Sequence, residues 1–180
     1  MKKKICFFIP EVTGGGTERV VCQLMSYFAK NDYEVSLMLL QDRTRAYEVD
    51  PKVQVILLPS AGNKIGQMLG RIKFIHKYLK KNPECVICTF LFRTLIYTFF
   101  AKFGTKNRWI VSERNNPLET PAGKVNRFVR DHAFCFADRC VFQTEDAKNY
   151  FPKPARKKGI VIPNPIRDIE PKECLMMSIS

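Results

Sequence analysis

The stretch KICFFIPEVTGGGTERVVCQLMSYFAK, residues 4–30, decides the fold of this chain. Its first six residues form a continuous apolar run, which is typical of a parallel strand covered on both faces. Residues 17–30 then show helical spacing with a single apolar stripe. The stripe consists of Val20, Val21, Leu24, Met25 and Phe28. A strand, a glycine-rich turn and an amphipathic helix in this order predict the first unit of a Rossmann-like sheet.

Apolar runs alternate with helix-like segments along the rest of the chain, as in an α/β protein with a mostly parallel sheet. We expect seven strands, at 4–9, 34–40, 53–58, 85–90, 108–112, 139–143 and 159–163. We expect helices at 17–30, 64–81, 92–103, 122–136 and 144–150. The predicted fold is a single Rossmann-like, doubly wound domain whose sheet is flanked by helices.

Gly14, Gly15 and Gly16 lie where the first strand meets the first helix, at the edge where such sheets bind ligands. Glycine permits positive φ and close approach to the backbone, and the free amides of a helix N-terminus favour a phosphate or a hydroxyl. Thr17 is expected to cap the helix. The pattern matches neither GxGxxG nor the P-loop, which disfavours dinucleotide binding and P-loop chemistry. A merely tight turn is the alternative interpretation.

The seven cysteines include one CxxC pair, Cys85 and Cys88, which lies inside a predicted strand. No second pair or nearby histidine completes a metal site, so we interpret the thiols as structural and the compartment as reducing. His76 and His132 fall on predicted helices away from the strand ends, and we interpret them as structural too. We therefore expect neither a metal nor a cofactor.

Nearly all of the net charge of +13 lies in the middle of the chain, where residues 61–130 hold 14 Lys or Arg against 3 Asp or Glu. The predicted helix at 64–81 combines basic faces with an apolar stripe. The stripe consists of Ile65, Met68, Leu69, Ile72, Ile75 and Leu79. A cationic amphipathic helix of this kind binds anionic lipid surfaces, although a solvated face over a core stripe is an open alternative. The expected membrane contacts are Arg71, Lys73, Lys77, Lys80 and Lys81.

Four segments together resemble the amino-terminal half of bacterial family 4 glycosyltransferases, which build capsule, exopolysaccharide or lipopolysaccharide sugars. They are the stretch from Ile9 to Leu40, VSERNNP at 111–117, ADRCVFQTEDAKNYFP at 137–152 and IVIPNPI at 160–166. The resemblance covers residues 3–168. It implies a GT-B architecture, in which two Rossmann-like domains face each other across a cleft. It also implies retaining transfer of a sugar from a nucleotide-sugar donor to a glycan or lipid-linked acceptor.

The resemblance also assigns roles to residues at the strand ends. It implies that the glycine loop lines the cleft near the donor diphosphate and the acceptor, with Thr17 and Glu18 at its rim. Relatives often carry a histidine after the strand that ends at Ser112, and here Arg114 occupies that position. Arginine is no general base at neutral pH, but its donors hold a phosphate or an acidic sugar; a surface salt bridge is the alternative. The expected substrate-binding residues are Gly14, Gly15, Gly16, Thr17, Glu113, Arg114 and Asn115.

The resemblance further implies a domain boundary, with residues 1–166 forming the glycosyltransferase amino-terminal domain and residues 167–180 beginning a linker or a truncated tail. In the family the second domain carries most nucleotide contacts and a paired-glutamate motif, for which Glu170 and Glu173 stand too close together. We therefore expect the catalytic residues in a second domain that this chain lacks, and no activity of the chain alone.

The expected location is the cytoplasm, with peripheral contact to the inner face of the cytoplasmic membrane. Two other functions stay open, a non-catalytic acceptor- or membrane-binding module and a basic nucleic-acid-binding protein. The second is disfavoured because the chain shows no RNP, KH, zinc-finger or helix-turn-helix signature, so we expect no nucleic-acid partner.

Overall fold

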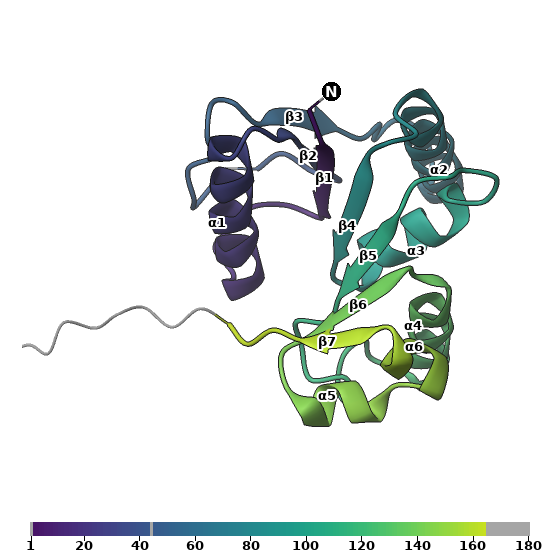
Figure 1. Cartoon of the computed structure of the whole chain (residues 1–180). Helices are drawn as coiled ribbons and strands as arrows, with labels where there is room; N and C mark the ends of the chain where they lie inside the picture. Colours follow the sequence, from purple (N-terminus) through teal and green to yellow (C-terminus); the bar gives the residue numbers. More distant parts are fainter. Residues whose placement is uncertain (1, 44, 165–180) are drawn as a thin grey trace, which may run out of the picture.

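The apolar runs of the sequence form a parallel sheet of seven strands (Figure 1). A computed structural model describes residues 2–43 and 45–164. The strands are β1 (Lys4–Ile9), β2 (Glu34–Leu39), β3 (Gln54–Leu57), β4 (Val86–Phe90), β5 (Trp109–Ser112), β6 (Arg139–Phe142) and β7 (Gly159–Val161). The helices are α1 (Gly16–Lys30), α2 (Lys64–Lys81), α3 (Phe92–Ala101), α4 (Lys124–Phe136), α5 (Glu145–Tyr150) and α6 (Lys153–Lys157). The predicted α/β class with a seven-stranded parallel sheet is confirmed.

The strand order is β3-β2-β1-β4-β5-β6-β7, and it reverses direction between β1 and β4. Ile5 of β1 pairs with Val35 of β2 on one side and with Val86 of β4 on the other. Since all neighbouring strands are parallel, their carboxyl ends meet at one edge of the sheet. In open α/β sheets, ligands bind at that edge beside the point where the strand order reverses.

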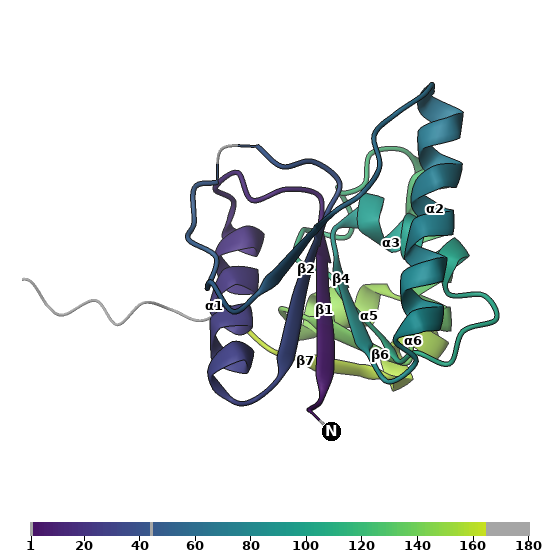
Figure 2. The same cartoon turned by 90° about the horizontal axis from the view of Figure 1, so that it is seen from above.

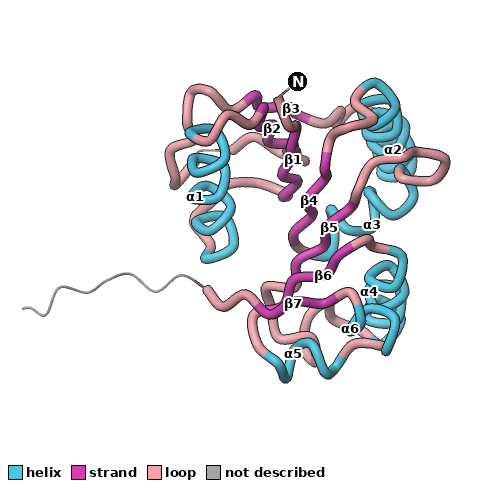
Figure 3. Tube along the Cα trace, viewed as in Figure 1, coloured by secondary structure: helices cyan, strands magenta, loops and turns pink. Residues whose placement is uncertain are grey.

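The two faces of the sheet carry very different numbers of helices. Helix α1 lies on one face, whereas α2, α3, α4 and α6 lie on the other (Figures 1 and 2). The connection from β2 to β3 is a long loop without a helix among its described residues (Figure 3). Beside α1, the sheet carries an open, mainly apolar groove with a volume of about 570 Å³, which lies over β1, β4 and β5. Its lining includes Leu24, Tyr27, Phe90, Ile110, Arg114 and Ile162.

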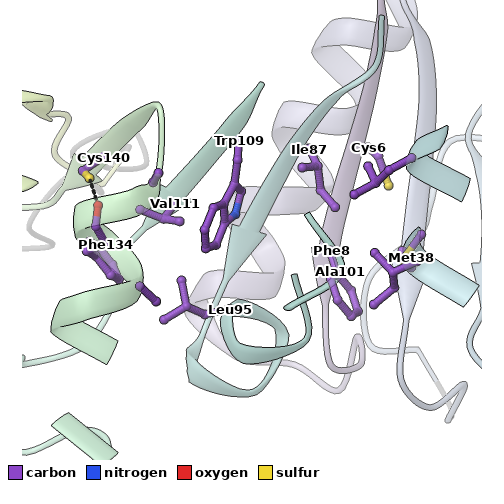
Figure 4. Packing of buried hydrophobic residues seen from close by; sticks show 14 of the residues in the cluster. Cys6, Phe8, Met38, Ile87, Leu95, Ala101, Trp109, Val111, Phe134 and Cys140 are labelled. Atoms are coloured by element: carbon purple, nitrogen blue, oxygen red, sulfur yellow. Dashed lines mark hydrogen bonds between the residues drawn. The ribbon is translucent and has the colours of Figure 1, made fainter. Parts of the chain in front are cut away.

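The larger core lies between the sheet and the α2–α4 layer (Figure 4). Trp109, the single tryptophan, is buried there, and its indole Nε1 donates a hydrogen bond to Thr89 Oγ1 at 2.9 Å. Phe134 of α4 packs nearby, and its backbone carbonyl accepts from the thiol of Cys140 at 3.5 Å. Both polar groups of this region are thus satisfied inside the core, which removes the cost of burying them.

Helix α2 differs from its prediction in how much of its apolar stripe packs. Ile75 and Leu79 are fully buried, but Ile65 and Leu69 are more than half exposed and Met68 is 40% exposed. The reason is geometric, because the first turns of α2 extend beyond the sheet (Figure 2). The amino-terminal half of the stripe therefore faces outward rather than the core.

Candidate functional site

Four loops meet at the carboxyl edge of the sheet and form the candidate site. The glycine loop follows β1, Leu91 follows β4, residues 113–121 follow β5, and Asn164 lies three residues after β7. Leu91 has φ 71° and ψ 153°, a backbone conformation that is almost restricted to glycine and costs about 1–3 kcal/mol. Such strain persists only where the surrounding structure holds it, and it clusters at functional sites.

The three glycines occupy three different backbone positions. Only Gly14 has a positive φ, 117°, and its carbonyl accepts a hydrogen bond from the Tyr47 hydroxyl at 3.1 Å. Gly15 is the N-cap of α1 with φ −76° and ψ 164°, and Gly16 is the first helical residue. The predicted capping role of Thr17 is therefore wrong, because the helix begins before it. No side chain caps this helix, so its first amides are free of side-chain partners.

The room around Gly15 and Gly16 shows whether the packing of the domain requires glycine at these positions. A Cβ added at Gly16 would meet no atom within 4 Å, and a Cβ at Gly15 would overlap only the carboxylate of the flexible Glu18 side chain. Neither residue needs a positive φ. Nothing in the packing of the described domain therefore requires glycine at positions 15 and 16. Glycine is a favoured N-cap residue, which suits Gly15, and the absence of a side chain at both positions leaves the backbone open to close approach.

Arg114 lies at the carboxyl end of β5 and joins two distant parts of the chain. Its guanidinium contacts the side-chain oxygen of Asn164, which also accepts from Gln143 Nε2 at 3.4 Å. Arg114 is half-buried, and burial lowers the pKa of its guanidinium. Among the described residues, its Nε atom has no hydrogen-bond partner. The predicted position of Arg114 at the carboxyl edge of the sheet agrees with the structure, and its unpaired Nε atom is buried.

Glu113 does not face the open edge, in contrast to its predicted role in substrate binding. Its side chain is 8% exposed, and Oε1 accepts hydrogen bonds from the backbone amides of Arg114 and Asn115, both at 3.1 Å. Its other oxygen lies 3.6 Å from a guanidinium nitrogen of Arg130. Burial raises the pKa of the Glu113 carboxyl. Glu113 therefore positions Arg114 and the exposed Asn115, because its carboxylate is already occupied by the protein.

Arg130 of α4 holds the loop from the inside and was not predicted from the sequence. The residue is 1% exposed, and its guanidinium donates to the backbone carbonyls of Pro117, at 2.9 Å, and of Thr120. It also pairs with Asp131 at 2.8 Å and lies 4.8 Å from the centre of the Phe151 ring. A signal was present in the sequence, because Arg130 is three residues before the buried Ala133 and so lies on the core face of the helix.

Arg71 is wrongly predicted as a membrane contact. It is 4% exposed, and its guanidinium donates to the carbonyl oxygen of Pro59 at 3.0 Å and to the Tyr97 hydroxyl at 3.3 Å. Its spacing of four residues from Ile75 places it on the buried face of α2. The other four predicted contacts are exposed: Lys73, Lys77, Lys80 and Lys81.

The remaining candidate residues have structural surroundings. Cys85 and Cys88 are buried free thiols, and burial raises the pKa of Cys85 to about 11 and of Cys88 to about 12. His76 Nδ1 lies 2.8 Å from the carbonyl oxygen of Ala101, and the His132 ring packs against Phe128. Among residues 2–43 and 45–164, no three His, Cys, Asp or Glu side chains are grouped to hold a metal ion. The same residues contain no helix long and apolar enough to cross a bilayer. Glu170 and Glu173 lie outside the described residues.

Comparisons with known proteins agree on one family. The model of the family described as Glycosyltransferase Family 4 matches residues 14–168. An N-acetylgalactosaminyltransferase of Campylobacter jejuni, named for an undecaprenol diphosphate-linked glycan, is 27% identical over 164 residues. That alignment covers 88% of this chain and 45% of the relative, so the chain spans about half the relative's length.

Solved glycosyltransferase structures share the fold of this chain. The Anabaena protein HepE, in complex with UDP and glucose, has a TM-score of 0.67 and 15% identity, over 91% of this chain and 45% of HepE. The lipopolysaccharide outer core galactosyltransferase WaaB has the same TM-score and identity, over 91% of this chain and 46% of WaaB. The fold, the order of the segments and the family match agree with one another. The chain belongs to glycosyltransferase family 4.

Proposed function

We propose that this chain is the amino-terminal, acceptor-side half of a retaining glycosyltransferase. It would move a sugar from a nucleotide-sugar donor to a glycan or lipid-linked acceptor in the synthesis of a bacterial surface polysaccharide. The family match supports the transferase class. Two similar proteins support these kinds of donor and acceptor. HepE was crystallised with UDP and glucose, and the Campylobacter relative is named for a glycan linked to undecaprenol diphosphate. No metal or cofactor is part of the proposal.

The glycine loop is the observation that carries this proposal. Gly15 and Gly16 are not needed for the packing of the domain, and the uncapped amides that follow them begin a helix of 15 residues. The positive end of the helix dipole favours a phosphate or a polarised hydroxyl at this place. Arg114 adds a guanidinium at the same edge. We propose that Gly14–Thr17, Arg114 and Asn115 contact the substrates. Glu113 and Arg130 would position the loop that carries Arg114 and Asn115.

We propose that the chain does not transfer sugar by itself. It covers about 45% of the length of the Campylobacter relative and of HepE. Transfer needs a leaving diphosphate that is stabilised on every side in a water-poor cleft. The proposed catalytic residues therefore belong to a second Rossmann-like domain in the same polypeptide, to which residues 167–180 would lead. This domain division remains a proposal.

The test is a transfer assay with radiolabelled UDP-N-acetylgalactosamine, UDP-glucose and UDP-galactose, with undecaprenyl diphosphate-linked oligosaccharides as acceptors. The chain alone is compared with a version continued by a complete second domain. We expect turnover only from the longer version, and Gly16→Val should abolish it at unchanged thermal stability. Turnover by the chain alone would refute the half-site proposal. No turnover by a folded longer version would favour a non-catalytic acceptor-binding module, which the partial coverage of the relatives also supports.

We also propose that α2 brings the chain to the inner face of the cytoplasmic membrane. Lys73, Lys77, Lys80 and Lys81 are exposed, and each basic residue near an anionic surface contributes about 1 kcal/mol of binding. Replacing these four lysines by glutamine should weaken co-sedimentation with phosphatidylglycerol vesicles and reduce its sensitivity to salt. Arg71 is left unchanged, because it belongs to the core. Equal binding of both proteins would make α2 an ordinary solvated helix.

A further inference from the structure

Helices α3 and α4 expose an unusual number of large apolar side chains. We name this surface the α3–α4 band, and its members are Phe100, Phe103, Val125, Phe128 and Phe136, which are 49%, 62%, 75%, 62% and 61% exposed. Single exposed apolar residues are ordinary, but a group of them on one face marks an interaction site. The band lies on the helical face opposite α1 and apart from the glycine loop (Figure 1).

The members of the band form a continuous surface. Phe99 of α3 connects the two parts of the band, because its ring centre lies 5.5 Å from those of Phe103, in the turn after α3, and of Phe136 on α4. On α4, the centre of the His132 ring lies 4.1 Å from that of Phe128, with the two rings tilted by 42°, and His132 lies between Phe128 and Phe136 along the helix. Phe103 and Phe136 also line an open hollow of about 210 Å³, whose floor includes Trp109. The single tryptophan thus lies directly beneath the band.

The sequence of α4 makes the band a second apolar face rather than a poorly packed core face. Val125, Phe128, His132 and Phe136 follow helical spacing along one side. The core side of the same helix carries Ala133 and Phe134, which are buried in the core between the helices and the sheet. The helix is therefore apolar on two sides, and within the described residues the outer side has no cover.

The charge around the band favours an anionic partner. Helices α2, α3 and α4 hold ten Lys or Arg and a single acidic residue, Asp131, which pairs with Arg130. Only Arg71 and Arg130 among these ten are buried. Exposed phenylalanines flanked by lysines match the surface of an anionic bilayer, where rings enter the headgroup boundary and ammonium groups meet the phosphates. Interfaces with other proteins are aromatic too, but they are depleted in lysine.

We propose that the α3–α4 band is the apolar anchor of the domain on an anionic membrane, with Phe103, Phe128 and Phe136 inserted into the headgroup boundary. The band supplies insertion, whereas the lysines of α2 supply long-range attraction. The inference rests on the membrane contact proposed above and deepens it, because it defines which face of the domain meets the lipid. The carboxyl edge of the sheet then remains open to soluble and lipid-linked substrates.

The test uses the chain with vesicles of phosphatidylglycerol and phosphatidylethanolamine that contain brominated acyl chains. Bromine quenches tryptophan emission at short range, so Trp109 reports the depth of the band directly. We expect quenching on binding, and the triple variant Phe103→Gln, Phe128→Gln, Phe136→Gln should bind at least about tenfold more weakly. The matched control replaces Leu24 and Tyr27, exposed apolar residues of α1 on the opposite face, by Gln. This control should bind like the unsubstituted chain, and urea unfolding verifies that all variants are folded.

Two results would overturn the proposal. One is vesicle binding by the triple variant that equals that of the unsubstituted chain. The other is self-association or complex formation that the triple variant abolishes, without any Trp109 quenching by lipid, which would make the band a protein interface. The variant with the four α2 lysines replaced by glutamine tests the electrostatic contribution separately from the insertion of the band. It should bind more weakly at low salt, yet its bound fraction should show the same quenching, because the inserted rings are unchanged.

Discussion

Gly14, Gly15 and Gly16 are adjacent, but replacing each by alanine should have a different effect on stability. Gly14→Ala forces a side chain to φ 117° and within 3.3 Å of Ala46, so we expect a loss of about 1–3 kcal/mol in unfolding free energy. Gly15→Ala removes a favoured N-cap residue and should cost about 1 kcal/mol or less. Gly16→Ala should be neutral or stabilise the fold by up to about 1 kcal/mol, because alanine suits a helix better. Urea unfolding measures all three, and equal values would contradict the three distinct backbone positions.

Glu113 gives the stability of the domain a specific dependence on pH. Burial raises the pKa of its carboxyl in the folded state, so the folded protein binds this proton more tightly than the unfolded chain. The stabilisation from Glu113 is fully present below the unfolded pKa, about 4.3, and is lost as pH rises through the folded value. Glu113→Gln should remove this decline, which shows in unfolding free energies measured from acid to neutral pH. Glu145→Gln on α5 is the control for loss of an exposed carboxylate.

Some of these residue-level features followed from the sequence and others did not. The placement of the glycine loop and Arg114 was predictable, because the carboxyl ends of parallel strands share one edge. The burial of Glu113 was not predictable, since its partner Arg130 is 17 positions away. The loop carbonyls to which Arg130 donates carry no sequence signal either. Arg71 and Arg130 were interpretable from helical spacing, but charged residues are expected outside unless a partner is known.

At the scale of elements, apolar periodicity predicted helices α1 to α5 to within two residues at each end. Helix α2 begins and ends as predicted, because Asn63 caps it with an Oδ1 bond to the Gly66 amide at 2.8 Å. Helix α6 was not among the expected helices. It begins in a Pro-rich stretch, Pro152 to Pro154, and proline is tolerated in the first turn of a helix. The α3–α4 band was missed for another reason. Periodicity identifies an apolar face but cannot tell which of two faces is covered.

The loop of residues 113–121 depends on one guanidinium, and this dependence is testable. Arg130→Met should lower the unfolding free energy by about 3–5 kcal/mol, because it leaves the buried Glu113 carboxylate without its partner. Lys124→Met, at the exposed start of the same helix, should change it by less than about 0.5 kcal/mol. Hydrogen exchange of the Glu119 and Thr120 amides, which bond to the Asn116 carbonyl, should speed up only in Arg130→Met. Unchanged exchange there would show that the loop is held by other contacts.

At the scale of the whole molecule, the domain is asymmetric in both helices and charge. One face carries α1 beside an open groove, and the other carries the basic helices with the α3–α4 band. The candidate site lies between these faces, at the carboxyl ends of the strands. The sequence predicted the sheet and the basic middle of the chain, since both depend on local patterns. The expected helices also left the segment between the strands at 34–40 and 53–58 without a helix. Which face each helix covers could not be predicted, because it depends on the order of the strands in the sheet and not on local patterns.

The reversal of strand order between β1 and β4 divides the chain into two pieces that are separable at a single peptide bond. Hydrolysis between Ala61 and Gly62, both exposed, would leave β1–β3 with α1 on one piece and β4–β7 with the remaining described helices on the other. Among the described strands, the two pieces would then pair only along β1 and β4. Co-expressed as separate polypeptides, they should reassemble without a covalent link. Their unfolding midpoint should rise with protein concentration, because the cut turns a closed loop into a bimolecular association. A domain so divided would serve as a split reporter, whose signal depends on the seam between β1 and β4.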